Sequence, residues 1–257
     1  MLSLGRSVEE EAPRLAADLG LTVYETAVML RAPPPVIVLR SDDRARTVDV
    51  LGKLRSRGHD AIACDLDAVV SSDDMFRPKA FRFDRGDLVG TGSGEERRLP
   101  LASIFALVRA SHSLRVEDTI KKEERKLSMG RIALTGGLLR SKTETREERR
   151  VVLEREAVLY VFRVDAAPWL LAASYLRYDG LAAAMRPSKL ENFEVLVRTL
   201  RELATSAVFD TRLLAVRPAT NVVSAGPKHL SASSASTIDT FAHILATSLR
   251  KAVQPYR

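Results

Sequence analysis

The side chains best suited to chemistry in this chain are its histidines, and they form no catalytic pattern. His59, His112, His229 and His243 lack both the spacing of metal ligands and a recurring carboxylate neighbour. The sequence also contains no HExxH, no pair of CxxC motifs and no GxSxG. The four histidines are therefore predicted to be structural or surface residues, and no bound metal is expected.

Glycines and aspartates offer two further candidates for a site. The glycine runs at residues 90–94 and 136–137 show neither GxxxxGK[ST] nor GxGxxG opening a helix, so turns are favoured over phosphate loops. Asp165, Asp179 and Asp210 each follow the end of a predicted element, where aspartate commonly forms turns. An acidic cluster is the alternative for these three. The sequence thus predicts a protein that is not an enzyme and has no cofactor.

The composition indicates an ordinary soluble protein of one or two domains. The chain has 257 residues, of which 46% are hydrophobic and 28% charged, enough for sizeable cores. No apolar run approaches the roughly 18 residues of a membrane-spanning helix, and the acidic N-terminal stretch does not fit a signal peptide. The one cysteine, Cys64, lies in the apolar run AIAC and is predicted to be a buried thiol. A cytoplasmic location is therefore expected.

The net charge of +7 is unevenly distributed along the chain. Residues 1–75 hold 9 basic and 13 acidic groups, whereas residues 76–257 hold 31 basic and 20 acidic groups. The basic part could attract nucleic acid, anionic lipid or an acidic protein surface. However, arginine supplies 31 of the 40 basic residues, an excess that GC-rich coding also produces. Aromatic residues make up only 5% and are not interleaved with basic ones, which argues against a stacking platform for single strands.

The elements that would position any site begin with residues 7–65, where local signals predict two helices in succession. Gly20 ends the first helix, and Thr22 and Glu25 form a capping box that opens the second. Prolines at residues 33–35 stop the second helix. The second helix is expected to supply apolar contacts from Tyr24, Ala27, Val28 and Leu30.

The same region predicts a strand, a helix and a second strand. The β-branched run at residues 36–39 is typical of a buried strand, and residues 61–64 are its expected partner. Between them, Ser41 is expected to cap a third helix and Gly58 to end it. The sequence therefore predicts two parallel strands joined by one crossing helix.

This order of elements resembles the C-terminal domain of the bacterial ribosomal stalk protein and the related fold of the Clp-protease adaptor. Gly20 and Leu21 with the helix that follows occupy the place of the stalk's Gly-Leu turn and factor-contacting helix. The stalk carries lysines there, and its first strand has a counterpart only if residues 1–4 supply a fragment. The resemblance implies a small docking domain without catalysis. Neither translation-factor binding nor degron recognition carries over.

Residues 79–214 predict a second domain, of antiparallel strands followed by a helix. Ser188 and Glu191 form the capping box of that helix, and Trp169 and Tyr160 lie in strand-like runs where large rings are expected in the core. With the turn Leu-Pro-Leu-x-x-Ile, the pattern resembles bacterial members of the pleckstrin-homology-like superfold.

Taken together, these signals predict an α+β chain. A small α/β docking domain precedes a mostly antiparallel, barrel-like β domain that has a capping helix and a C-terminal helix. The predicted boundaries are residues 1–67 for the docking domain, 68–78 for a linker, 79–214 for the β domain with an insertion at 115–155, 215–236 for a flexible linker and 237–257 for the last helix.

The insertion carries the sharpest candidate for a functional surface. It holds 12 basic and 8 acidic groups around an apolar centre, and predicts two long strands joined by a turn at residues 136–137. Three roles are open: a hairpin packed on its own domain, a protein-docking arm, or contact with an anionic membrane, where each basic group is worth about 1 kcal/mol. The candidate docking residues are Arg125, Lys126, Met129, Arg131, Leu134, Leu138, Leu139, Arg140 and Lys142.

The last predicted helix has an apolar face behind a flexible tether. That face includes Ile238, Phe241 and Leu245. It could dock on its own domain, pair with a partner, or pair with a second copy of the chain.

Docking to an unidentified protein partner, as a non-enzymatic adaptor or regulatory protein, is the function that the sequence favours. The alternative is a binder of anionic lipid or nucleic acid through the basic second domain, and an enzyme comes third. Salt dependence separates the first two, because phosphate binding weakens steeply as salt rises.

Overall fold

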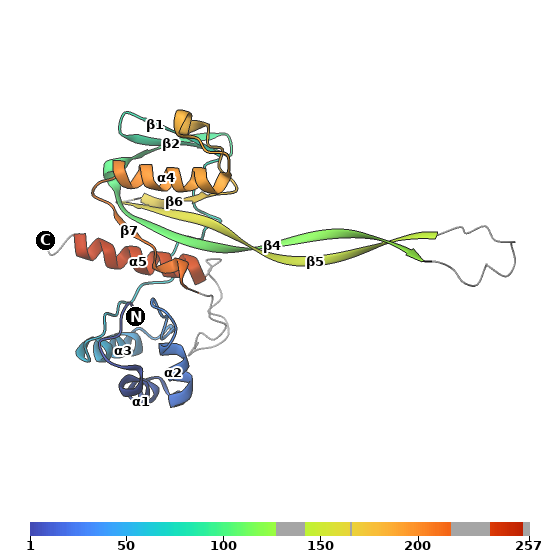
Figure 1. The fold of residues 1–257 in the computed structure, drawn as a ribbon. Coiled ribbons are helices and arrows are strands. Elements are labelled where there is room, and N and C mark those ends of the chain that lie inside the picture. Colours follow the sequence, from blue (N-terminus) through green and yellow to red (C-terminus); the bar gives the residue numbers. More distant parts are fainter. Residues whose placement is uncertain (127–141, 165, 217–236, 254–257) are drawn as a thin grey trace, which may run out of the picture. The chain divides into compact units, whose positions relative to one another are not determined.

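A computed structural model describes residues 1–126, 142–164, 166–216 and 237–253. The chain forms two compact units. Unit 1 comprises Met1–His112 and Ala157–Arg257, and unit 2 comprises Ser113–Glu156. Helices and antiparallel sheets are both present, which confirms the predicted α+β class (Figure 1).

The described elements divide into a helical N-terminal region and a strand-rich remainder. The helices are α1 (Val8–Leu19), α2 (Val23–Leu30), α3 (Arg44–Ser56), α4 (Lys189–Leu203) and α5 (Thr237–Val253). The strands are β1 (Ala80–Asp84), β2 (Asp87–Gly92), β3 (Glu95–Pro100), β4 (Ile104–Lys126), β5 (Lys142–Arg163), β6 (Ala166–Ala172) and β7 (Val208–Asp210).

Most helix ends lie where the sequence predicts, because capping depends on near neighbours in the chain. Gly20 ends α1 in the left-handed conformation with φ of 73°. Thr22 and Glu25 form the reciprocal capping box of α2, and Ser188 and Glu191 form that of α4.

Helix α3 begins later than predicted. Its N-cap is Asp43, whose side chain accepts a hydrogen bond from the Arg46 N–H, while Ser41 Oγ accepts from the Asp43 N–H. The prediction that Ser41 caps this helix is therefore wrong, because a second capping residue stands closer to the first helical turn. Gly58 follows the C-cap Arg57 with φ of 86°.

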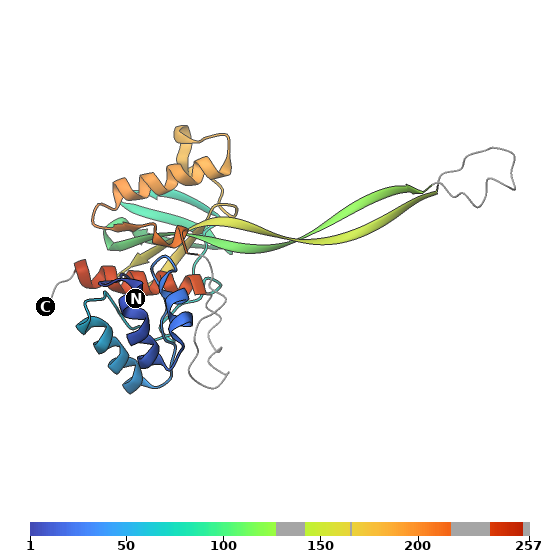
Figure 2. The ribbon, with the colours of Figure 1, turned by 60° about the horizontal axis from the view of Figure 1, so that its bottom comes forward.

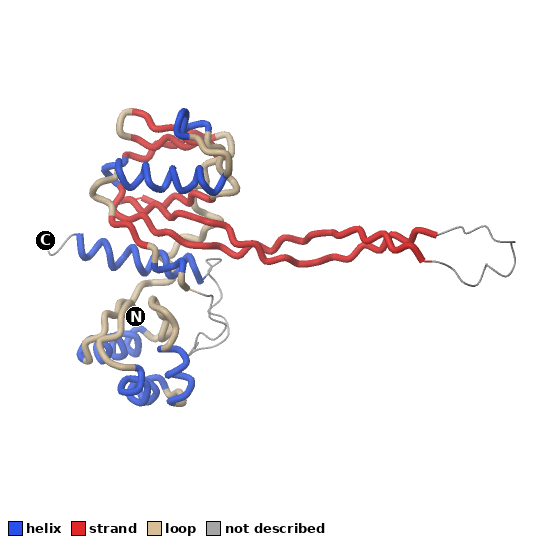
Figure 3. Tube along the Cα trace, in the orientation of Figure 1, coloured by secondary structure: helices blue, strands red, loops and turns tan. Residues whose placement is uncertain are grey.

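The two predicted N-terminal strands are extended but are not strands of a parallel pair (Figure 3). Met1 exchanges two backbone hydrogen bonds with Val36, at 2.7 and 2.9 Å. The Asp60 N–H donates to the Ser3 carbonyl at 3.2 Å, in an antiparallel bridge. The predicted parallel unit is therefore wrong: the first three residues bridge the two segments, as a first strand would.

The β domain contains two separate sheets rather than a barrel. Strands β1, β2 and β3 form an antiparallel sheet, and the second sheet has the order β6-β5-β4-β7 with β7 parallel to β4. The short 3-10 turn Leu101–Ser103 carries the chain from one sheet to the other. No ladder joins the two sheets in the described part of the chain, so the predicted barrel-like closure is wrong.

The four-stranded sheet is a middle layer with α4 on one face and α5 on the other (Figures 1 and 2). Because side chains alternate along a strand, β5 serves both cores. Leu159 and Val161 pack in the core that includes α4, and Val158 and Tyr160 pack in the core that includes α5. Tyr160 and Trp169 are both fully buried, as the sequence predicts.

Helix α5 docks on its own unit. Ile238, Phe241 and Leu245 are buried in the core that they share with the sheet. Of the three roles that the sequence leaves open for this apolar face, the structure shows docking on the rest of its own unit. On α4, Phe193, Val197 and Leu200 are buried, whereas Leu190 and Leu203, which have the same helical spacing, lie at the two ends of the helix and are exposed.

Unit 2 consists of the parts of β4 and β5 that pair only with each other. Strand β7 pairs with β4 at residues 106–108, and β6 pairs with β5 at residues 158–163. Between those positions and the ends of the described strands, β4 and β5 are each other's neighbours. The two long predicted strands are confirmed, and the predicted turn at residues 136–137 lies outside the described residues.

Candidate functional site

Helix α2 presents an apolar face to solvent. Val23, Tyr24 and Val28 are 50%, 77% and 48% exposed, whereas Thr26 and Leu30 are buried. The prediction that Tyr24 and Val28 supply core contacts is therefore wrong. The sequence pattern is equally apolar on both sides of this short helix, so only the packed structure shows which side is covered.

The exposed face is held rigidly by the start of the helix. The Thr22 N–H and hydroxyl both donate to Glu25 Oε2, at 3.0 and 2.7 Å, and the Glu25 N–H donates back to Thr22 Oγ1 at 3.2 Å. These bonds hold the pKa of Glu25 below its ordinary value. The Thr26 hydroxyl donates to the Thr22 carbonyl at 3.0 Å. Tyr24 is thus carried on a fixed first turn.

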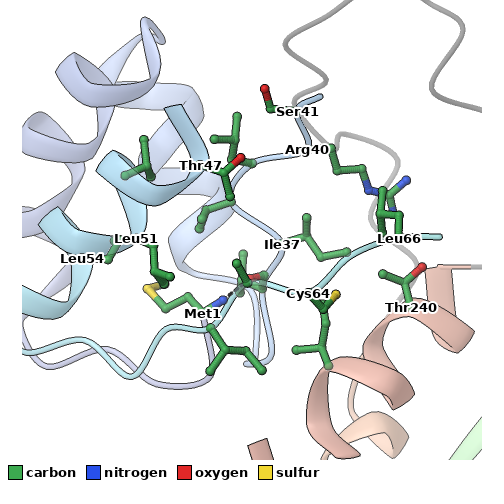
Figure 4. A pocket seen from close by; sticks show the side chains of 17 residues that line it. Met1, Ile37, Arg40, Ser41, Thr47, Leu51, Leu54, Cys64, Leu66 and Thr240 are labelled. Carbon is green, nitrogen blue, oxygen red and sulfur yellow. Dashed lines mark hydrogen bonds between the residues drawn. The ribbon is translucent and has the colours of Figure 1, made fainter. Parts of the chain in front are cut away.

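The second feature is a cavity beside α3, with a volume of about 110 Å³ and a lining of both aliphatic and polar residues (Figure 4). We call it the α3 cavity. It is lined by the extended segments at residues 36–40 and 62–64, by α3, and by two residues of α5. Its aliphatic lining includes Val36, Val38, Leu51, Leu54, Ile62 and Ile244.

Arg40 has the one charged side chain among the described residues that line the α3 cavity. Its Nε is buried without a hydrogen-bond partner. Cys64 also lines the cavity, and burial raises the pKa of its thiol, with Asp65 adding to the rise. The Met1 ammonium and Arg40 oppose that rise. Burial also lowers the pKa of the Met1 amine to about 6. The thiol therefore lies within electrostatic reach of Arg40.

Near the cavity, a buried ionic cluster fixes the N-terminal segment. The Gly5 N–H donates to His59 Nδ1 at 3.0 Å, so the proton of the neutral ring lies on Nε2, which is 2.9 Å from Glu11. Arg57 lies 2.9 Å from Glu11 and 2.7 Å from Asp18. The side chains of Glu11 and His59 have no solvent exposure. No substrate reaches this pair, and its role is structural, as predicted for His59.

A second polar cluster fixes α5 to the sheet. The Tyr160 hydroxyl donates to Asp239 Oδ1 at 2.6 Å, and His112 Nε2 lies 2.6 Å from the same hydroxyl oxygen. Because the phenol proton is used on Asp239, the His112 N–H donates to Tyr160. Burial raises the pKa of Tyr160, and the Asp239 carboxylate raises it further. The hydroxyl is therefore a poor proton donor for catalysis.

Most surface arginines of the small sheet are paired with acids. Arg82 lies 2.9 Å from Glu96, Arg97 lies 2.8 Å from Glu95, and Arg98 lies 2.9 Å from Asp84.

Two basic side chains beside the small sheet contact an aromatic ring instead of an acid. Arg77 and Lys79 lie 5.5 and 5.6 Å from the ring centre of Tyr175 and have no ion pair in the described part of the chain.

The docking residues predicted in the insertion fall into two groups. Arg125 and Lys126 lie at the end of β4, and Lys142 begins β5. The others lie outside the described residues and stay a prediction: they are Met129, Arg131, Leu134, Leu138, Leu139 and Arg140.

The predicted acidic candidates serve separate ion pairs. Asp179 lies 2.9 Å from Arg177, and Asp210 lies 2.6 Å from Arg212, while Asp165 is outside the described residues. Among the residues that the structure describes, no group of three or more histidines, cysteines or acids is arranged to hold a metal ion. In the glycine run at residues 90–94, Gly90 and Gly92 lie in β2, and only Ser93 and Gly94 form the turn to β3.

No protein-family model, curated protein or solved structure matches the chain. The described helices include none that is long and apolar enough to cross a membrane.

Proposed function

We propose that this protein is a non-enzymatic adaptor that docks to other proteins through the exposed face of α2. The observation that carries the proposal is the exposure of Tyr24, Val23 and Val28 on one rigid helix. Tyrosine is enriched at interface centres because it buries a large ring and keeps a polar end. An exposed apolar face of this kind is typical of a protein-binding surface.

Charge indicates what kind of protein would fit. Glu25 lies on α2 itself, and the Glu9 and Arg31 pair nearby is widely exposed. Residues 1–75 as a whole carry more acids than bases, with 13 against 9. The surface that suits this face has an apolar centre and a basic rim. The long strands of unit 2 would supply a second docking element.

A binder of anionic phosphate is the second candidate, and one observation favours it. Arg77 and Lys79 flank Tyr175 without an acid partner in the described residues, so an anion could be held between them. The pairing of Arg82, Arg97 and Arg98 with acids weighs against a broad basic stripe. Protein docking is therefore the better supported function.

Substitution on α2 tests the proposal. Tyr24→Asp places a charge at the centre of the face, and Leu190→Asp is the matched control, because Leu190 is a 58% exposed leucine on α4. Each variant is immobilised and the proteins it retains from a native lysate are quantified. We expect a specific set to be lost with Tyr24→Asp and kept with Leu190→Asp. Equal recovery by both variants and the unchanged chain would reject α2 as the docking face.

A further inference from the structure

We propose that the α3 cavity is a binding site for a short aliphatic carboxylate, with its hydrocarbon tail against Leu51 and Ile62 and its carboxylate on Arg40. This site is separate from the α2 face and does not depend on the docking function.

The size of the cavity sets the size of the tail. An aliphatic cavity of roughly 150 Å³ is known to hold one benzene ring. The α3 cavity, at about 110 Å³, is somewhat smaller. It therefore has space for a tail of about three to five carbon atoms. Val36, Val38 and Leu54 complete the aliphatic part of the lining, against which an apolar tail can pack.

The charge of the ligand follows from Arg40. Its Nε is buried with no hydrogen-bond partner, and in the described part of the chain Arg40 has no ion pair. A buried donor without an acceptor is costly, and a carboxylate supplies two acceptor oxygens in the geometry that guanidinium prefers. The acid that acts on the cavity thiol is Asp65, which follows Cys64 in the chain. The carboxylate therefore belongs on the Arg40 side of the cavity, with the tail pointing away from Asp65.

Cys64 makes the cavity directly observable. It is the one cysteine of the 257-residue chain, it lines the cavity, and it is partly exposed. A neutral thiol reagent such as iodoacetamide therefore reports occupancy of the cavity in the unmodified protein. A bound ligand would slow the reaction by covering the sulfur.

The experiment measures the alkylation rate of Cys64 in the full chain with isovalerate, with its uncharged counterpart isovaleramide, and with acetate as a tail-free control. We expect isovalerate to slow the reaction at least fivefold at millimolar concentration, isovaleramide less, and acetate hardly at all. No protection by isovalerate overturns the site. Equal protection by isovalerate and isovaleramide overturns the role of the charge.

Arg40→Met tests the proposed contact between Arg40 and the carboxylate. For each chain, the alkylation rate of Cys64 with ligand is divided by its rate without ligand, so that a change in thiol reactivity caused by the substitution cancels. We expect this variant to lose the preference for the acid and to keep the weaker protection by the amide. A preference for the acid that survives in Arg40→Met would assign it to another group. The comparison of acid with amide on the unchanged chain needs no variant, so it decides the proposal even if Arg40→Met does not fold.

Discussion

Helix α5 buries Ile238, Phe241 and Leu245 against the four-stranded sheet, whereas helix α2 leaves Val23 and Tyr24 exposed. Both helices carry apolar side chains on more than one turn. The two helices pack in different cores: α5 packs on one face of the four-stranded sheet, whereas α2 packs in the smaller core that it shares with α1 and α3. Burying one valine fully is worth about 1.5–3 kcal/mol. On α2 that gain is not made within the described part of the chain.

The two helices also differ in polar anchoring. Helix α5 is fixed by the Tyr160 hydroxyl on Asp239 and by His243, whose Nε2 donates to the Val70 carbonyl at 3.2 Å. The polar bonds of α2 are internal, between Thr22 and Glu25. Internal bonds make α2 rigid and leave its outer face free for contact.

The largest effect is expected from truncating the centre of the α5 face. Phe241→Ala should lower the free energy of unfolding by about 3–5 kcal/mol, because it removes a buried ring from the core shared with the sheet. Urea unfolding followed by tryptophan fluorescence checks this, since Trp169 lies in the adjoining core. A loss below about 1 kcal/mol would contradict the tight docking of α5.

A smaller loss is expected from removing one hydroxyl in the polar anchor. Tyr160→Phe keeps the ring and deprives both Asp239 and His112 of a hydrogen bond in a buried site. Losing a buried hydrogen bond to a charged group costs about 1.5–3 kcal/mol. The same unfolding experiment measures it. A variant as stable as the unchanged chain would show that the cluster adds nothing to α5 docking.

The anchoring of α5 should weaken in mild acid. Burial lowers the pKa of His243 from its ordinary 6.5, against the opposing effects of the Val70 carbonyl and Asp239. The unfolded chain then binds the proton more readily than the folded chain, so stability is complete above pH 6.5 and falls as the pH drops below it. His243→Gln should flatten this dependence. If the two chains lose stability in parallel between pH 7.5 and 5.5, His243 is not the responsible group.

The sequence predicted these regions unequally, for physical reasons. Gly20, Thr22 and Glu25 act within one turn, so the ends of α1 and α2 could be predicted. The burial of Trp169 followed from its apolar neighbours. The exposure of Tyr24 could not be predicted, because it depends on which elements fold over α2. Nor could the α3 cavity, which Thr240 completes from a part of the chain distant in sequence.

The same reasoning explains the two wrong strand predictions. Residues 36–39 have the composition of a strand, but their backbone partner is Met1, which no periodic pattern indicates. The barrel-like domain was predicted from the number of strand-like runs. Such runs do not indicate whether the first and last strands of a sheet pair to close a barrel. A three-residue β7 and the turn Leu101–Ser103 leave two open sheets instead.

Removing most of unit 2 should have little effect on the stability of unit 1. Replacing residues 116–148 by a short Gly-Ser turn leaves the three apolar cores intact, because each is built from described residues of unit 1. We expect a nearly unchanged melting temperature by circular dichroism. Partner recovery measured beside it shows whether the strands of unit 2 also dock. Unfolding of the shortened chain would make these strands part of the core.

The smallest effect on stability is expected at α2. Tyr24→Ala removes a ring that is 77% exposed, so the free energy of unfolding should change by no more than about 0.5 kcal/mol. Thr22→Ala, which removes the cap beneath it, should cost about 1 kcal/mol. Urea unfolding curves of the two variants compare the free energy lost at the exposed face with the free energy lost at the helix cap. A large loss from Tyr24→Ala would mean that this ring is a core residue after all.

Photocrosslinking at α2 shows whether its exposed face contacts another protein. A photoreactive phenylalanine analogue is placed at Tyr24 in one chain and at Leu190 in another, both exposed positions on helices. After irradiation in a native lysate, adducts are separated by mass and identified. We expect a discrete protein adduct from position 24, which the unlabelled chain competes away and its Tyr24→Asp variant does not. The same adducts from both positions, or none from position 24, would contradict it.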